Sequence, residues 1–136
     1  MLFRSYPAAR RRLLESLRER RTANPVSLAG DVHSFNVSEL RTDFDDPASP
    51  AVASEFVGTS ITSQAWAQER LNAFLPDNPH IRLIDSRHRG YVRAELTPGL
   101  LRVDLRAMES VAKPDAACAT LASFVVEDGK PGPQRA

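Results

Sequence analysis

The chain has 136 residues, of which 42% are hydrophobic and 26% charged, and 18 basic side chains balance 17 acidic ones. These values are typical of one globular domain, and no run approaches the ~18 consecutive apolar residues of a transmembrane helix. The near-neutral charge argues against a chain that binds nucleic acid or a membrane surface along its whole length. A single cysteine, Cys118, excludes an internal disulfide framework and a zinc site built from cysteines alone.

The N-terminal region predicts an amphipathic helix that ends near Asn24, which precedes a proline. Leu13, Leu14 and Leu17 are spaced to share one face, and arginines cover the other. Residues 9–14 superficially resemble a twin-arginine export signal, but polar residues follow in place of the required apolar stretch. The arginine-rich face could bind nucleic acid. Because no aromatic residues lie among the charges, we interpret it as a solvent-exposed helix face.

Two strands with a loop between them are expected next, and the helix-then-strand order indicates an α/β layered fold. Residues 25–30 form a short apolar run typical of a buried strand, and residues 51–57 form a second candidate strand. Residues 41–50 are polar and turn-forming, which predicts the loop. Ser63 is a suitable N-cap for a helix that continues to the neighbourhood of Phe74.

The second half of the chain alternates apolar and polar residues, which is typical of half-exposed strands. Turn-forming residues at 87–90 and 97–99 separate three such runs, so we expect an antiparallel meander, then a further strand and a loose tail. The three runs lie at residues 81–85, 91–96 and 101–106, the further strand at 120–127 and the tail at 128–136.

Asp31 and His33 are the most informative residues, because a carboxylate and an imidazole follow the end of an apolar strand, two positions apart. If the chain stays extended there, both side chains point to the same side and can address one cation. Sites in open α/β sheets lie just beyond the carboxyl ends of strands, where this pair is expected. A carboxylate with an imidazole suits iron, zinc or manganese, whereas oxygen ligands alone suit calcium. The alternative is a chance occurrence of Asp-x-His.

Four further residues are weaker candidates. Glu55 and Thr59 lie at the end of the second strand and are candidates to line the same site; alternatively, Glu55 only satisfies neighbouring backbone groups. His80 and His88 are candidate ligands or general acids, or simply loop histidines that form hydrogen bonds. The acidic residues at 43–46 could bind calcium but lack EF-hand spacing, which favours a solvated turn.

A series of motifs carries a family resemblance. The longest is Asn-Pro-Val-Ser-Leu-Ala-Gly-Asp-Val-His-Ser-Phe at residues 24–35, which contains Asp31 and His33. The others lie at residues 6–10, 43–47, 54–63, 78–80, 88–91 and 123–129. In order and spacing they resemble the C-terminal part of the catalytic domain of the alkaline phosphatase D (PhoD-like) family, over residues 6–136.

The resemblance implies a metal-dependent phosphoric ester hydrolase of the alkaline phosphatase or phosphodiesterase type. Iron and calcium are the metals it implies, and other divalent metals stay open. Asp31 and His33 match the family's late metal ligands and take that role by resemblance. The implied fold is a four-layered α/β/β/α metallophosphatase domain. Of this α/β (α+β) domain the chain would supply the C-terminal portion: a helix, a strand with the metal pair, then a mostly antiparallel sheet.

The earlier motifs of the family, which supply an Asp, a Tyr, an Asn and in some members a Cys, have no counterpart here. Residues 1–136 are therefore expected to be a partial domain without its N-terminal half. The alternative function is a truncated, non-catalytic remnant or an interaction module. Unpaired sheet edges and an exposed apolar face would favour self-association or pairing with the absent half.

The expected partner is a phosphate ester, with no nucleic acid and no membrane span. Members of the family are usually exported, but no signal peptide is recognisable in this sequence. The compartment, the preferred ester and the bound metal are therefore left open.

Overall fold

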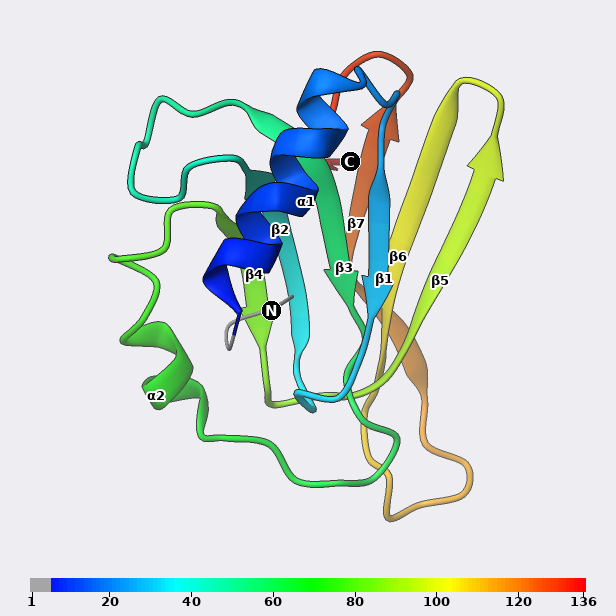
Figure 1. The fold of residues 1–136 in the computed structure, drawn as a ribbon. Helices are drawn as coiled ribbons and strands as arrows, with labels where there is room; N and C mark the ends of the chain where they lie inside the picture. Colours follow the sequence, from blue (N-terminus) through cyan, green and yellow to red (C-terminus); the bar gives the residue numbers. More distant parts are fainter. Residues whose placement is uncertain (1–5) are drawn as a thin grey trace.

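The computed structural model describes residues 6–136, and the first five residues of the expected domain lie outside the described part. Two four-stranded sheets pack face to face, and helix α1 (Pro7–Glu19) covers the outer face of the first sheet (Figure 1). The order of layers is helix, sheet, sheet, which confirms the α+β class. Residues 6–136 form no helical layer on the outer face of the second sheet.

The first sheet has the strand order β1-β3-β2-β4. Its strands are β1 (Val26–Ala29), β2 (Phe35–Arg41), β3 (Ala51–Val57) and β4 (Ile81–Asp85). Strand β1 runs parallel to β3, and the β2–β3 and β2–β4 pairs are antiparallel. Because β1 and β3 run in the same direction, both end at the lower end of the sandwich in Figure 1.

The second sheet is antiparallel throughout, with the order β5-β6-β7-β8. Its strands are β5 (Arg89–Thr97), β6 (Leu100–Met108), β7 (Cys118–Glu127) and β8 (Gln134–Arg135). Strands β5 and β6 form a hairpin whose turn includes Pro98 and Gly99, as the turn-forming residues at 97–99 predicted.

The main core lies between the sheets. Phe56 of β3 and Phe124 of β7 meet there with ring centroids 6.5 Å apart. Apolar side chains at alternate positions of both sheets surround them: Phe35, Val37, Val103, Leu105, Ala107, Ala122 and Val126. A smaller cluster of Leu14, Leu40 and Ala53 fixes α1 to the outer face of the first sheet. In β6, the alternation in the sequence places Val103 and Leu105 correctly, because one face of the strand is buried in the sandwich.

The expected three-strand meander is wrong, because its first strand belongs to the other sheet. Strand β4 pairs with β2, whereas β5 and β6 form the hairpin of the second sheet. The residues between Asp85 and Arg89 carry the chain from one sheet to the other. Alternation of apolar and polar residues marks a strand but does not identify its partner, which explains the error.

Strand β2 is an element that the sequence analysis did not predict. It occupies the centre of the first sheet between β3 and β4, and six of its seven residues are buried. Phe35 and Val37 face the core, while Asn36 and Ser38 lie on the opposite face, where the Ser38 hydroxyl donates to the Asn36 side-chain oxygen at 2.6 Å.

Both helices are shorter than expected. Helix α1 ends five residues before Asn24, because Arg21 adopts a left-handed φ of 51° and donates its N–H to the Arg18 carbonyl. Such a left-handed residue ends many helices. Helix α2 contains only Gln68–Asn72 in place of the expected 63–74. Within residues 6–136, neither helix has the length and apolar character needed to cross a membrane.

Residues 128–136, expected to be a loose tail, return to the sandwich. Strand β8 pairs with β7, and the backbone N–H of Ala136 donates to the Ser123 carbonyl at 3.0 Å. The N–H of Gly132 reaches the hydroxyl of Ser54 on β3 at 3.2 Å. The C-terminal segment therefore contacts both sheets, because its backbone donors find acceptors on each of them.

Candidate active site at the end of the sandwich

Asp31 and His33 lie in a turn, residues 31–34, that together with Gly30 joins β1 to β2. The turn lies at the lower end of the sandwich in Figure 1, where β3 also ends and where the chain crosses from β4 to β5. Beside it, the N–H of Gly58 donates to the carbonyl of Ala29 at 2.8 Å. The parallel β1–β3 pair thus places the turn and the residues after β3 next to each other.

The backbone of this turn is not extended. Asp31 has a φ of 78° and His33 a φ of 57°, so both residues occupy the left-handed region. The sequence-based argument that they share a side because an extended chain alternates its side chains is therefore wrong. The turn itself keeps the two residues together, with Asp31 exposed and His33 half-buried.

The imidazole of His33 is oriented by residues after β3. Its Nδ1 lies 2.8 Å from the backbone carbonyl of Gln64. A carbonyl oxygen only accepts hydrogen bonds, so Nδ1 carries a proton, and in the neutral tautomer the lone pair is on Nε2. Metal-binding histidines commonly make such a bond with their second nitrogen. The ring of His33 therefore meets the chemical requirement for a metal ligand through Nε2.

The backbone carbonyl of His33 is held as well. The Thr59 hydroxyl lies 3.1 Å from it, and Nη1 of Arg89 donates to it at 2.8 Å. The same Thr59 hydroxyl lies 3.0 Å from the carbonyl of His88. Thr59 is thus a neighbour of the turn. Sequence analysis missed Gln64 and Arg89, which lie 31 and 56 residues from His33.

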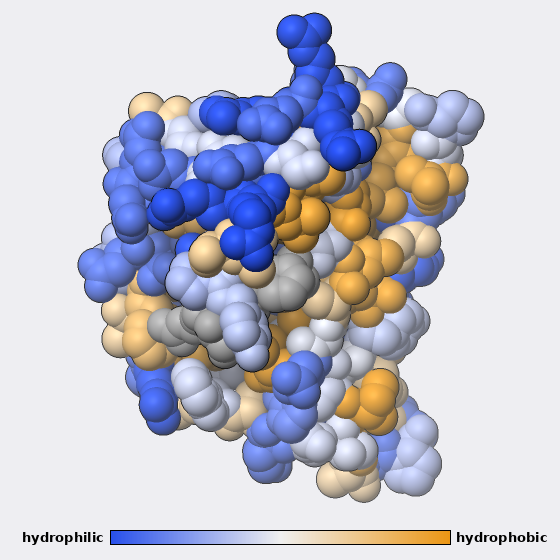
Figure 2. Space-filling view, viewed as in Figure 1, coloured by the Kyte–Doolittle hydropathy of each residue, from blue (hydrophilic) through white to orange (hydrophobic). Residues whose placement is uncertain are grey.

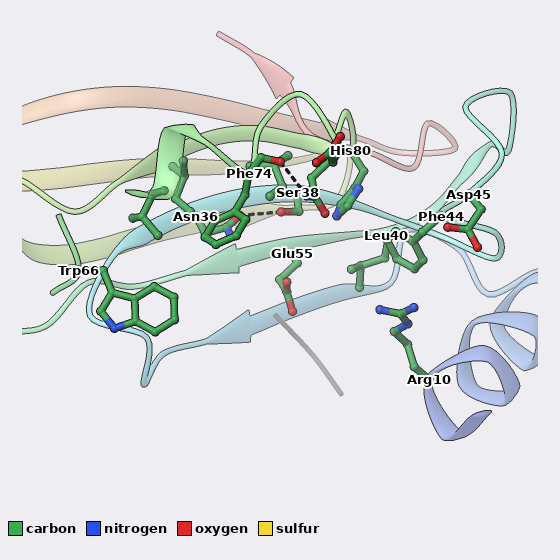
Figure 3. Close-up of a pocket in the computed structure, with 15 residues that line it drawn as sticks. Arg10, Asn36, Ser38, Leu40, Phe44, Asp45, Glu55, Trp66, Phe74 and His80 are labelled. Atoms are coloured by element: carbon green, nitrogen blue, oxygen red, sulfur yellow. Dashed lines mark hydrogen bonds between the residues drawn. The ribbon is translucent and has the colours of Figure 1, made fainter. Parts of the chain in front are cut away.

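Glu55 lies elsewhere. Its side chain is 2% exposed and projects from the middle of β3 into a pocket of about 290 Å³ beneath α1 and the residues around α2 (Figure 3). Arg10, Asn36, Ser38 and His80 line the same pocket. Since Asp31 and His33 are not among the lining residues, the structure separates Glu55 from the turn that it was expected to join.

His80 lines the same pocket as Glu55. Its ring lies edge-on to Phe44, with centroids 4.8 Å apart, and the Arg10 guanidinium lies over the same phenyl ring at 4.4 Å. Burial, with the positive charges of Arg41 and Arg10, lowers the pKa of His80. A neutral imidazole packed against an aromatic ring fits the alternative in which His80 is a structural residue.

His88 pairs with a buried carboxylate. Its Nδ1 lies 2.8 Å from Oδ1 of Asp85, which also accepts the backbone N–H groups of Arg87 and His88. Burial raises the pKa of Asp85, but the hydrogen bonds from His88 and Arg87 outweigh it and leave that pKa below its usual value. Asp85 thereby organises the turn in which the chain crosses between the sheets.

Within residues 6–136 there is no cluster of three or more His, Cys, Asp or Glu side chains arranged to hold a metal ion. Asp31 and His33 are accordingly a pair of candidate ligands and not a complete set. Two of the acidic residues at 43–46 use their carboxylates locally. Asp43 accepts the N–H of Asp45, and Asp46 accepts the N–H of Ala48, as in a solvated turn.

The fold and this end of the sandwich define a layered α+β domain that presents an aspartate and an oriented histidine on a turn. The model of the PhoD-like phosphatase family matches residues 3–105, and the chain belongs to this family.

Alkaline phosphatase D of Bacillus subtilis (strain 168) is 39% identical over 130 residues, which are 93% of this chain and 22% of that protein. A solved structure of PhoD matches with a TM-score of 0.87 at 38% identity, over 98% of this chain and 26% of the other. The chain thus spans about a quarter of the length of these relatives.

Proposed function

We propose that the chain is the part of a PhoD-like phosphatase domain that supplies two metal ligands, Asp31 and His33, for the hydrolysis of phosphate esters. The orientation of His33 is the observation that supports this most strongly. Its Nδ1 lies 2.8 Å from the Gln64 carbonyl, so that in the neutral ring Nε2 is the nitrogen available to a metal ion. The carboxylate of Asp31 is exposed on the same turn and supplies the charge that a multivalent cation requires.

Iron and calcium are the proposed metals, as the family resemblance implies. A bound multivalent cation neutralises phosphate charge and lowers the pKa of a coordinated water. The residues of this chain serve that chemistry by holding ligands. Thr59 and Arg89 fix the backbone of the turn, and Gln64 fixes the ring of His33.

Further ligands must come from outside residues 6–136, because catalytic metal sites generally use three or more protein ligands. We propose that they belong to the part of the domain that this chain does not span. The relatives provide the reason, since the chain covers only 22% and 26% of their lengths.

The molecule offers an open edge to which such a part could attach. Among residues 6–136, β1 pairs only with β3 and β5 only with β6, so each has one free edge. Figure 2 shows hydrophobic residues gathered along the right-hand side, over β1 and the β5–β6 hairpin. Leu28 and Leu96 are 63% and 79% exposed there, beside a hollow of about 450 Å³.

Free strand edges with exposed apolar side chains attract further strands. We propose that this surface, the open edge formed by β1 and β5, packs against the rest of the domain, or against a second copy of the chain where that is absent.

The proposed function is tested in a hybrid protein. In it, residues 6–136 of this chain replace the matching segment of the Bacillus subtilis alkaline phosphatase D. We expect the hybrid to hydrolyse a chromogenic phosphate ester in the presence of iron and calcium. Asp31→Asn should lower kcat/KM at least about 100-fold, because a neutral amide is a poor ligand for a multivalent cation. Asp45→Asn, at an exposed residue of the loop between β2 and β3, is the matched control and should leave activity unchanged.

The alternative function, a non-catalytic remnant or interaction module, predicts a different result. A folded hybrid without hydrolysis, or one whose activity is indifferent to Asp31→Asn, would favour that alternative over the enzyme.

A further inference from the structure

Arg89, the first residue of β5, joins three segments at the end of the sandwich. Its Nη1 donates to the carbonyl of His33 at 2.8 Å and lies 3.1 Å from the hydroxyl of Thr59. Its Nη2 donates to the carbonyl of Ser86 at 2.6 Å. One partly buried guanidinium from the second sheet therefore connects the 31–34 turn of the first sheet with the residues after β3 and β4.

The turn needs such a contact because its backbone is strained. His33 and Asp31 are not glycines, yet both have left-handed φ values of 57° and 78°. A non-glycine residue in that region costs about 1–2 kcal/mol and persists only where its surroundings hold it. The hydrogen bonds of Arg89 and Thr59 to the His33 carbonyl hold the peptide that follows the strained φ of His33.

The imidazole depends on this backbone position. The bond between Nδ1 and the Gln64 carbonyl forms only if the Cα of His33 directs the ring toward residue 64. If the His33 carbonyl is released, the residue can relax to an extended conformation, which turns its side chain away. The ring would then lose the contact that keeps the proton on Nδ1.

We infer that Arg89 is a positioning residue of the candidate metal site: by holding the His33 carbonyl it keeps the imidazole in the orientation that offers Nε2. The inference rests on the proposed function for the identity of the ligand, but the coupling between Arg89 and His33 is independent of it. Lysine cannot replace Arg89 fully, because the planar fork donates from two nitrogens at once to carbonyls on different segments.

The test uses the 136-residue chain and records the His33 tautomer by long-range proton–nitrogen NMR, with its Cα and Cβ chemical shifts. The unsubstituted chain should show the Nδ1–H tautomer and left-handed backbone shifts. Arg89→Gln and Arg89→Lys should give a mixture of tautomers and shifts nearer extended values. Arg87→Gln is the matched control: Arg87 lies two positions away on the same segment, but its guanidinium pairs with Asp85 and not with the turn.

A second readout is the affinity for Mn²⁺, measured by broadening of the His33 resonances. Loss of a residue that orients a ligand lowers metal affinity about 10- to 100-fold, which is the decrease expected for Arg89→Gln relative to Arg87→Gln. Unchanged His33 tautomer and shifts in both Arg89 variants would overturn the inference. Should Arg89→Gln fail to fold, Arg89→Lys, which keeps the charge, decides by the same spectra.

The two proposals fail in different ways. If His33→Ala leaves metal binding by the hybrid protein unchanged while the Arg89 substitutions still change the His33 tautomer, the metal role of His33 is wrong and the coupling stands. If Mn²⁺ binds at His33 equally in all variants with the tautomer unchanged, the positioning role of Arg89 is wrong and the metal role stands.

Discussion

Some residues of the candidate site can be identified from the sequence, whereas others are found only in the folded structure. Residue type and spacing made Asp31 and His33 candidate ligands, and the family resemblance gave them the metal role. Their left-handed backbone could not be predicted, because neither residue is a glycine that would signal it. Arg89 and Gln64 are ordinary polar residues in the sequence, and only the fold brings them to His33.

Asp104 on β6 is a buried carboxylate whose contribution to the stability of the second sheet can be measured. The residue is 3% exposed, accepts the Ser123 hydroxyl at 2.6 Å and pairs with Arg93 and Arg102. The Ser123 hydrogen bond, opposed by burial and supported by Arg93, holds the pKa of Asp104 below its usual value.

Because the folded pKa of Asp104 lies below the unfolded one, its carboxylate stabilises the fold at neutral pH. This stabilisation begins to fall as the pH drops below about 5 and is lost through the folded pKa. Urea unfolding should show Asp104→Asn to be about 2 kcal/mol less stable at pH 7 and less sensitive to acid than the unsubstituted chain. The exposed Asp115→Asn should behave like the unsubstituted chain. Equal acid sensitivity of Asp104→Asn and the unsubstituted chain would refute the role of Asp104.

At the level of elements, the pattern of residues predicted most strands but missed β2 and β8, and it overestimated the length of both helices. Strand β3 has the expected bounds, Ala51–Val57, because it begins after a loop rich in proline and aspartate and ends at a glycine. The helix expected at 63–74 shrinks to Gln68–Asn72, and the Gln68 side chain accepts the backbone N–H of Ser86 after β4. Such a contact between distant segments leaves no local signal.

Substitution of Gly90 on β5 tests how closely β5 and β6 pair. Its φ is 153°, and a Cβ built there would lie 1.9 Å from the backbone oxygen of Arg106 on β6. Gly90→Ala should therefore push the two strands apart and cost about 2–3 kcal/mol in the free energy of unfolding. Gly99→Ala, where a Cβ meets no atom within 4 Å, is the control for thermal unfolding of both variants. A Gly90→Ala protein as stable as Gly99→Ala would show that β5 and β6 are not this close.

For the whole molecule, the family resemblance predicted what periodicity could not, namely the layered architecture. Periodicity joined residues 81–106 into one sheet, whereas the chain divides them between two. The free edges of β1 and β5 follow from this arrangement and define one side of the sandwich.

The open edge formed by β1 and β5 predicts that copies of the chain associate. We expect the 136-residue chain to dimerise or aggregate in sedimentation velocity, because Leu28 and Leu96 expose 63% and 79% of their surface beside unpaired strands. The double substitution Leu28→Ser and Leu96→Ser should shift the distribution toward monomer. Val111→Ser, at a residue 48% exposed in the loop between β6 and β7, should not. A monodisperse monomer without any substitution would count against a docking role for this edge.

The most direct test of the central claim is the metal content of the hybrid protein, measured by elemental analysis after exchange against iron and calcium. If Asp31 and His33 are ligands, His33→Ala should lower metal affinity at least about tenfold relative to the unsubstituted hybrid. His80→Ala, which alters a histidine in the separate pocket, should retain the metal. Equal metal content and affinity in the His33→Ala and unsubstituted hybrids would contradict the assignment of this turn as a metal-binding site.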